Sequence, residues 1–234
     1  MLESREVTKN YLRKTAVNHV SLQLEPGKIY AILGPNGSGK TTWMKMAAGL
    51  VKPSSGEILY NGKPVGVESK KDIAYMSTEP YFYNWMTVKD VGAYYQDFFE
   101  DFSMEEYHRL LQRMELTEDL KTKALSTGMM AKLKIAVTMA RKAKVYLLDE
   151  PLNGIDLMAR DEIMRSILES AGSDVTLMLS SHLVDELEKI VSTAIFMKHG
   201  NLVTVCDAEE LRMQQGKSIV DLYREIYGHG GEQS

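Results

Sequence analysis

Residues Gly34–Thr41 read Gly-Pro-Asn-Gly-Ser-Gly-Lys-Thr, and this stretch decides the fold of the chain. Its spacing, G-x-x-x-x-G-K-[ST], is that of a phosphate-binding loop. The apolar run at 29–33 before it favours a buried parallel strand. Residues 42–50 after it contain no helix breaker before Gly49, which predicts a helix. A strand, a glycine-rich loop and a helix are the context that this motif requires.

The chemistry of this loop suits the phosphates of a nucleoside triphosphate. Its glycines let backbone N–H groups close around phosphate oxygens, and the helix N-terminus adds a partial positive charge. We expect Lys40 to reach the β- and γ-phosphates and the Thr41 hydroxyl to bind Mg²⁺. The residues predicted to contact the nucleotide are Gly34, Asn36, Gly37, Ser38, Gly39, Lys40, Thr41 and Thr42. The alternative, a surface turn beside a solvated lysine, does not explain the flanking strand and helix.

Composition narrows the class of protein. At 234 residues the chain can bury a full core, as one domain or one domain with a sub-domain. The 28 basic and 32 acidic residues give a net charge of −4, which argues against broad electrostatic binding to nucleic acid. Because Cys206 is the single cysteine, a reducing, cytosolic setting is expected. We find no signal-peptide pattern and no apolar run near the roughly 18 residues of a membrane helix, so we expect no membrane span.

A second motif lies at the end of the apolar run 145–148, where Asp149 and Glu150 follow one another. Carboxylates at the carboxyl edge of a parallel sheet, beside a phosphate loop, suit metal binding and catalysis. Asp149 is expected to hold Mg²⁺, and Glu150 to polarise the attacking water as a general base. Acidic residues also follow strands as helix caps, and without the phosphate loop that simpler interpretation would be preferred.

Around these motifs the pattern alternates between strands and helices, with a helical stretch in the middle. The N-terminal stretch with Tyr11 reads as polar. Strands are predicted at 17–24, 57–60, 73–76 and 175–179, with a hairpin at 194–205. Helices are predicted after a Thr87 cap, after a Ser103 capping box, from 126 to about 142, and at 158–170, 183–190 and 220–227, with a short one capped by Asp207.

Four stretches, in this order along the chain, carry a resemblance to a known family. They are Gly34–Thr41, Leu125–Met129, Asp149–Asp156 and Ser181-His182. Together they resemble the nucleotide-binding subunit of an ABC transporter, over nearly the whole chain. The nearest likeness is to the stand-alone ATPases of bacterial ABC-2-type exporters, including those that work on drugs, antimicrobial peptides or secreted peptide toxins.

The resemblance implies an α/β fold with a P-loop NTPase (RecA-like) core, N-terminal antiparallel strands and an inserted helical sub-domain. The chain is then a single ABC ATPase domain. Its α/β core is expected over 1–79 and 143–206, its helical sub-domain over 80–142 and a short C-terminal helical tail over 207–234.

The resemblance also implies roles for individual residues. Tyr11 matches the aromatic residue that stacks on adenine. Ser126 and Gly128 match the signature that contacts the ATP held by a second subunit. Asp156 matches the aspartate of the loop between the two sites, and His182 matches the histidine that contacts the γ-phosphate and positions water. For Tyr11 and His182 the alternative is an ordinary surface or core residue, and for Ser126 an ordinary helix cap.

Three residues depart from the family pattern. The signature Leu-Ser-Gly-Gly-Gln has Thr127 and Met129 in place of its first glycine and its glutamine. After the strand at 73–76 the family places a glutamine that touches Mg²⁺ and water, whereas this chain has Thr78 there, beside Glu79. A threonine oxygen has a shorter reach toward the metal, so we expect hydrolysis that is slower or coupled differently.

The implied function is that of an ATP- and Mg²⁺-dependent motor on the inner face of the cell membrane. It would pair with a second copy or a paralogous ATPase, drive a separately encoded transmembrane permease, and bind no nucleic acid. Aromatic residues gather between 81 and 99, where the family receives the coupling helix of the permease. A soluble ABC ATPase without a membrane partner stays open as an alternative. A small-molecule kinase would leave the signature and His182 unexplained.

Overall fold

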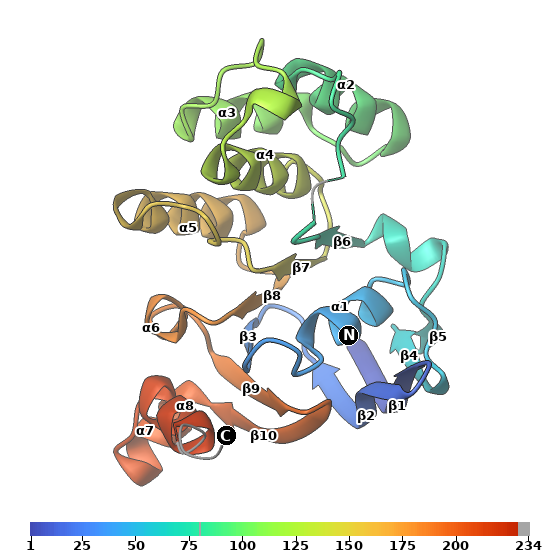
Figure 1. Cartoon of the computed structure of the whole chain (residues 1–234), viewed down its shortest axis with the longest axis vertical. Coiled ribbons are helices and arrows are strands. Elements are labelled where there is room, and N and C mark those ends of the chain that lie inside the picture. Colours follow the sequence, from blue (N-terminus) through green and yellow to red (C-terminus); the bar gives the residue numbers. More distant parts are fainter. Residues whose placement is uncertain (80, 229–234) are drawn as a thin grey trace. The chain divides into compact units, whose positions relative to one another are not determined.

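The computed structural model describes residues 1–79 and 81–228, which divide into two compact units (Figure 1). One unit contains Met1–Lys70 and the chain from Thr176 onward, and the other contains Lys71–Val175. Pro80 and positions 229–234 of the predicted tail lie outside the described residues. Every helix in the described ranges is too short or too polar to cross a membrane. The organisation as a single ABC ATPase domain stays a prediction, and each unit is considered by itself below.

An antiparallel sheet of four strands forms one part of the first unit. Its strand order is β2-β1-β4-β5, with β1 at Leu2–Tyr11, β2 at Lys14–Leu24, β4 at Ser55–Tyr60 and β5 at Lys63–Pro64. The N-terminal antiparallel strands that the family resemblance implies are therefore present, although the sequence pattern alone indicated no strand at β1. Irregular register shifts along β1, with Glu6 at φ 48°, break the alternation that would have indicated a strand.

The second sheet of this unit places the phosphate-loop strand at its centre. β3 (Ile29–Leu33) pairs in parallel with β8 (Thr176–Ser181) on one side and β9 (Thr193–Lys198) on the other. β10 (Asn201–Asp207) closes the predicted hairpin with β9. The helices are α1 (Lys40–Ala47), α6 (Val184–Leu187), α7 (Ala208–Gln215) and α8 (Ile219–Tyr227). α6 is shorter than the predicted 183–190, because turns formed by the amides of Ile190 and Val191 onto the Leu187 carbonyl follow it.

The second unit contains two parallel strands and most of the predicted helices. β6 (Ile73–Met76) pairs with β7 (Val145–Asp149). The helices are α2 (Val88–Phe98), α3 (Met104–Arg113), α4 (Thr127–Met139) and α5 (Leu157–Ala171), with a 3₁₀ turn at Thr122–Ala124. A further 3₁₀ turn, Glu68–Lys71, spans the position in the chain where the first unit ends and the second begins. The Thr87 cap is confirmed, since its hydroxyl and the Asp90 carboxylate form a reciprocal capping box.

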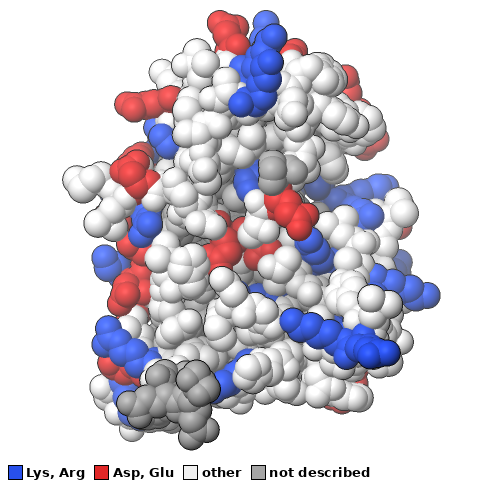
Figure 2. All heavy atoms as spheres, in the orientation of Figure 1, with Lys and Arg blue, Asp and Glu red and all other residues white. Residues whose placement is uncertain are grey.

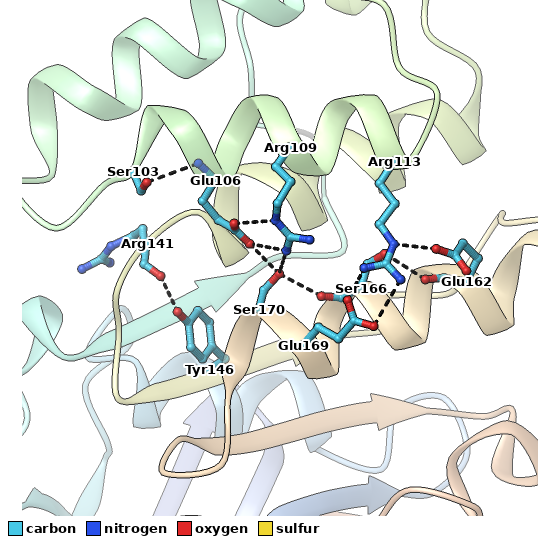
Figure 3. Close-up of polar contacts among 10 residues, drawn as sticks. All are labelled: Ser103, Glu106, Arg109, Arg113, Arg141, Tyr146, Glu162, Ser166, Glu169 and Ser170. Atoms are coloured by element: carbon cyan, nitrogen blue, oxygen red, sulfur yellow. Dashed lines mark hydrogen bonds and ion pairs between the residues drawn. The ribbon is translucent and has the colours of Figure 1, made fainter.

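At Ser103 only half of the predicted capping box is present. The Ser103 hydroxyl accepts a hydrogen bond from the Glu106 amide, but the Glu106 carboxylate accepts from Arg109 and from Ser170 on α5 (Figure 3). One turn further along α3, Arg113 pairs with Glu162 and with a second carboxylate of α5. The Glu106 carboxylate, which the local sequence pattern assigned to the Ser103 cap, thus forms its hydrogen bonds with Arg109 and with the neighbouring helix α5 instead.

Charged side chains of both signs share the molecular surface. On the face drawn in Figure 2, Lys and Arg lie interspersed with Asp and Glu among the described residues. Some form exposed ion pairs, such as Arg5 with Glu3 at 2.8 Å. Exposed pairs of this kind contribute little to stability, so the fold depends on its apolar cores.

Candidate nucleotide-binding and hydrolysis site

The phosphate loop follows β3 and runs into α1, as its sequence predicts. Gly34 adopts φ 153°, and a Cβ there would collide with the Met197 carbonyl oxygen of β9. Gly39 adopts φ 105°, and a Cβ there would lie 2.5 Å from the Ala16 carbonyl oxygen. Only glycine fits these two positions, because other residues would clash with backbone and strain the chain.

The C-terminal helix α8 supports this loop from behind. The Tyr227 hydroxyl lies 2.9 Å from the Met197 carbonyl oxygen and 3.3 Å from that of Leu33, the residue before the loop. The Tyr227 ring also stacks on Phe196, with centroids 6.4 Å apart. Burial raises the pKa of Tyr227, so its hydroxyl stays protonated and able to donate. The ends of β3 and β9 are thereby tied together at the start of the loop.

Two polar side chains of the phosphate loop are buried. Lys40 is 6% exposed, and its ammonium donates to the carbonyl oxygens of Gly34 at 2.6 Å and Pro35 at 3.2 Å. Among the described residues, the buried hydroxyl oxygen of Ser38 has no hydrogen-bond partner. Buried polar groups are normally satisfied, so an orphaned hydroxyl in a phosphate loop fits a site made for a polar ligand. Thr41 and Thr42 follow in the first turn of α1, half-buried.

His182 lies at the same sheet edge as the phosphate loop. Leu33 pairs with Ser181 in the parallel register, so Gly34 and His182 are the next residues on neighbouring strands. His182 is exposed. Tyr11 stands at the end of β1, 47% exposed, with the Lys9 ammonium 5.1 Å from its ring centroid. An exposed aromatic face of this kind is suited to stacking on a base.

In the second unit the two carboxylates and the threonine likewise follow neighbouring strands. Met76 pairs with Leu148 in parallel, so Ser77 and Thr78 leave β6 where Asp149 and Glu150 leave β7. Asp149 is fully buried, and the Tyr75 hydroxyl donates to its carboxylate at 3.3 Å. Burial and the Asp149 charge raise the pKa of Tyr75, which keeps this donor protonated.

Glu150 adopts a strained backbone conformation for a residue with a side chain. Its φ is 50°, in the left-handed region. Such conformations persist where the surrounding structure imposes them, and they cluster at active sites. Glu150 is half-buried, so its carboxylate remains accessible at the turn that follows β7.

The signature residues begin α4 and pack against the loop that leads into α5. Ser126 caps α4 by accepting from the Met129 amide at 3.2 Å, so the helix-cap interpretation is correct and leaves a nucleotide contact possible. The Thr127 methyl takes the space beside Gly154, where a Cβ would approach it to 2.6 Å, and a Cβ at Gly128 would lie 2.8 Å from the Gly154 carbonyl oxygen. Asp156 caps α5 through the Ala159 amide.

Three of the site residues predicted in this unit, Thr78, Ser126 and Glu150, line a cavity of about 280 Å³. Its lining residues include Thr78, Ser126, Thr127, Lys134 and Glu150. Sequence reasoning missed two side chains here, Tyr75 and Lys134. The signal that could have found Lys134 is a charged residue within the buried run Leu133–Val137, whose other members are apolar.

Comparison with known proteins agrees with this geometry. A family described as ABC transporter matches residues 17–153, which is more than half of the chain. The chain belongs to the ABC transporter family. It is an ATP-binding ATPase subunit of that family, as the motif order and the phosphate loop predict.

Two curated bacterial relatives illustrate the likeness. The ABC transporter ATP-binding protein YtrB of Bacillus subtilis is 30% identical over 215 residues, which cover 91% of this chain and 74% of that protein. The lantibiotic transport ATP-binding protein SrtF of Streptococcus pyogenes is 32% identical over 206 residues, which cover 87% of this chain and 89% of that protein.

Solved structures show the same fold. An ATP-binding subunit of an ABC transporter superposes with a TM-score of 0.86 at 25% identity, covering 97% of this chain and 99% of that one. A dimeric cassette in a post-hydrolysis state, bound to ADP and Pi, superposes with a TM-score of 0.79 at 22% identity, covering 88% and 98%. The predicted P-loop α/β fold is confirmed.

Proposed function

We propose that this chain is the ATP-hydrolysing motor of a bacterial exporter and drives a separately encoded transmembrane subunit. The observation that carries the proposal is the phosphate loop, with its buried Lys40 and a Ser38 hydroxyl that has no hydrogen-bond partner among the described residues. The relationship to a lantibiotic transport protein supports export of peptides or other amphipathic compounds. The motor would lie peripherally on the inner face of the cell membrane, held there by the permease.

The residues that would act on ATP have chemistry suited to their roles. Lys40 would neutralise the β- and γ-phosphates, with the loop glycines, Asn36, Thr42 and Tyr11 holding the rest of the nucleotide. Thr41, Asp149 and Thr78 offer the hard oxygen ligands that Mg²⁺ prefers. When bound, Mg²⁺ would offset the charge that develops on the phosphate oxygens. Glu150 would take the proton of the attacking water, and His182 would hold that water against the γ-phosphate.

Two chains would enclose two ATP molecules head to tail. Ser126 and Gly128 of one chain would then face the triphosphate held by the loop of the other, and Asp156 would lie between the two sites. The dimeric cassette among the structural relatives supports this arrangement. ATP would favour the closed dimer, and hydrolysis would weaken it. The nucleotide would therefore shift the dimer between a closed and an open state, and a membrane partner can use that change.

Aromatic side chains before and on α2 supply a surface for that partner. Tyr83 and Trp85 are 59% and 65% exposed, and their rings stack 5.9 Å apart. On α2 itself, Phe98 is 67% exposed. Tyr95 and Phe99, in contrast, stack on each other within the helical unit, and the Arg141 guanidinium lies 4.1 Å from the Phe99 ring centroid. Exposed aromatic residues of the first kind commonly dominate protein interfaces.

The test of this proposal is co-purification of the chain with an integral membrane protein. We expect Trp85→Ala or Tyr83→Ala to weaken that association by at least about tenfold, the loss of one aromatic interface residue. Pull-down of the membrane subunit should be measured beside the ATP affinity of the free chain. Met213→Ala, which removes an exposed apolar side chain from α7, should leave both unchanged. Equal loss of ATP binding and partner binding would assign Tyr83 and Trp85 to the core instead.

The departure from the family at Thr78 gives a second test. In Thr78→Gln the longer side chain should reach the metal directly, so we expect kcat for ATP hydrolysis to rise severalfold. Steady-state hydrolysis at saturating ATP and Mg²⁺ measures this. An unchanged rate, together with a large loss of activity in Glu79→Gln, would show that Glu79 already supplies the missing contact.

A further inference from the structure

Helix α4 contains a buried lysine that the proposed chemistry does not use. Lys134 is 6% exposed, within the buried run Leu133–Val137 of α4, whose other members are apolar. Burial lowers the pKa of this lysine, because removing an ammonium from water costs free energy. A buried charge of this kind rarely adds stability compared with an apolar side chain of similar volume. Its position therefore calls for an explanation other than packing.

The contacts of Lys134 point to the loop after β6. Its ammonium donates to the carbonyl oxygens of Ser77 at 2.9 Å and Thr78 at 2.8 Å. The buried carboxylate of Asp149, which follows the neighbouring strand, favours the charged form of the lysine. Helix α4 is the same helix that Ser126 caps, eight residues earlier, or about 12 Å along its axis. Lys134 thus links the signature helix to the backbone of Thr78, which stands at the position of the family's glutamine, and of Ser77 before it.

We infer that Lys134 is a positioning residue that compensates for the short side chain of Thr78. This inference rests on the proposed role of Thr78 beside the metal. A glutamine can reach a ligand through several rotatable bonds, whereas a β-branched threonine has one side-chain torsion with few rotamers. The place of the Thr78 hydroxyl is consequently set by its backbone. By holding the Ser77 and Thr78 carbonyls, Lys134 fixes that backbone and makes it move with the signature helix.

The experiment compares Lys134→Met with Lys134→Arg and with a control on the same helix. Lys132→Met is the control, because Lys132 donates to the Met114 carbonyl oxygen at 3.0 Å, away from this loop. For Lys134→Met we expect kcat to fall about tenfold to a hundredfold, as for a misplaced catalytic contact. The Mg²⁺ concentration for half-maximal rate should rise, and ATP affinity should stay within about twofold of the unmodified chain, since the phosphate loop is untouched.

Two further measurements separate positioning from packing. The melting temperature of Lys134→Met should stay close to that of the Lys132→Met control, because the loop carbonyls that lose the ammonium belong to residues that water can reach. Amide hydrogen exchange at residues 77–79 should become faster in Lys134→Met, and Lys134→Arg should restore part of the rate. In the Thr78→Gln background the fall in kcat caused by Lys134→Met should be smaller, which a double-mutant cycle measures.

The inference is overturned by normal kcat and unchanged exchange at 77–79 in Lys134→Met. It is also overturned if Lys134→Met melts well below the control and loses ATP affinity as much as kcat, since the lysine would then serve the core. Failure of the proposed function has a different signature. In that case the Glu150→Gln variant, with Lys134 intact, would hydrolyse ATP at the rate of the unmodified chain, whatever the effect of Lys134→Met.

Discussion

Glu150→Gln is expected to bind ATP normally and to hydrolyse it roughly 10²–10⁴-fold more slowly, the usual contribution of a general base. Glutamine keeps the shape of the side chain at this strained turn but cannot accept the proton of the attacking water. Because ATP would persist, the head-to-tail dimer should be trapped. Single-turnover hydrolysis and size-exclusion chromatography with ATP and Mg²⁺ measure the two effects.

The matched control for this variant is Glu105→Gln, which neutralises an exposed carboxylate in the first turn of α3. It should hydrolyse ATP at the unmodified rate and dimerise no more readily. Near-normal turnover in Glu150→Gln would remove Glu150 from the mechanism. A monomer that holds ATP without hydrolysing it would keep the catalytic role and reject the dimer.

Lys40→Ala should lose nucleotide affinity rather than turnover alone. One charge that faces two phosphates is removed, and a hydrogen bond to a charged group contributes about 1.5–3 kcal/mol, or roughly tenfold to a hundredfold in Kd. The ammonium also holds the Gly34 and Pro35 carbonyls, so the empty loop should loosen as well. Equilibrium titration with a fluorescent ATP analogue gives the Kd.

Lys45→Ala serves as the control for that titration, because Lys45 lies in the last turn of the same helix, away from the phosphate loop. The two variants remove the same charge from α1. Unchanged ATP affinity in Lys40→Ala would contradict its role, and an equal loss in Lys45→Ala would assign the effect to the stability of the helix.

The sequence was sufficient to predict those parts of the site whose conformation depends on neighbouring residues in the chain. The phosphate loop needs glycine at positions with unusual φ and close backbone, and such needs are visible as Gly34 and Gly39. The family resemblance placed Thr78 near the metal, and the parallel register of β6 and β7 puts Thr78 level with Glu150, the residue after Asp149. The roles of these residues in ATP hydrolysis remain predictions until the variants are measured.

What the sequence could not supply depends on contacts between distant segments. The local pattern did not indicate β1, because its bulges hide the alternation that strands normally show, and only the family resemblance implied N-terminal strands. The Glu106 carboxylate accepts hydrogen bonds from Arg109 and from Ser170, which lies 64 residues further along the chain, instead of completing the expected helix cap. Lys134 reads as one more helical lysine until the carbonyls of Ser77 and Thr78 are found at its ammonium.

The hydrogen bonds of the Tyr227 hydroxyl hold one end of the phosphate loop in place, while the tip of the loop is less constrained. At the Gly34 end, the loop rests on the Met197 carbonyl, which Tyr227 holds in place, so this end has no room to retreat. At Gly37 a Cβ would meet no heavy atom of the described residues within 4 Å. Adjustment to an incoming triphosphate is therefore confined to the tip of the loop. We therefore expect a force on the bound triphosphate to pass from Gly34 into the strands β3 and β9 and to deform the loop little at that end.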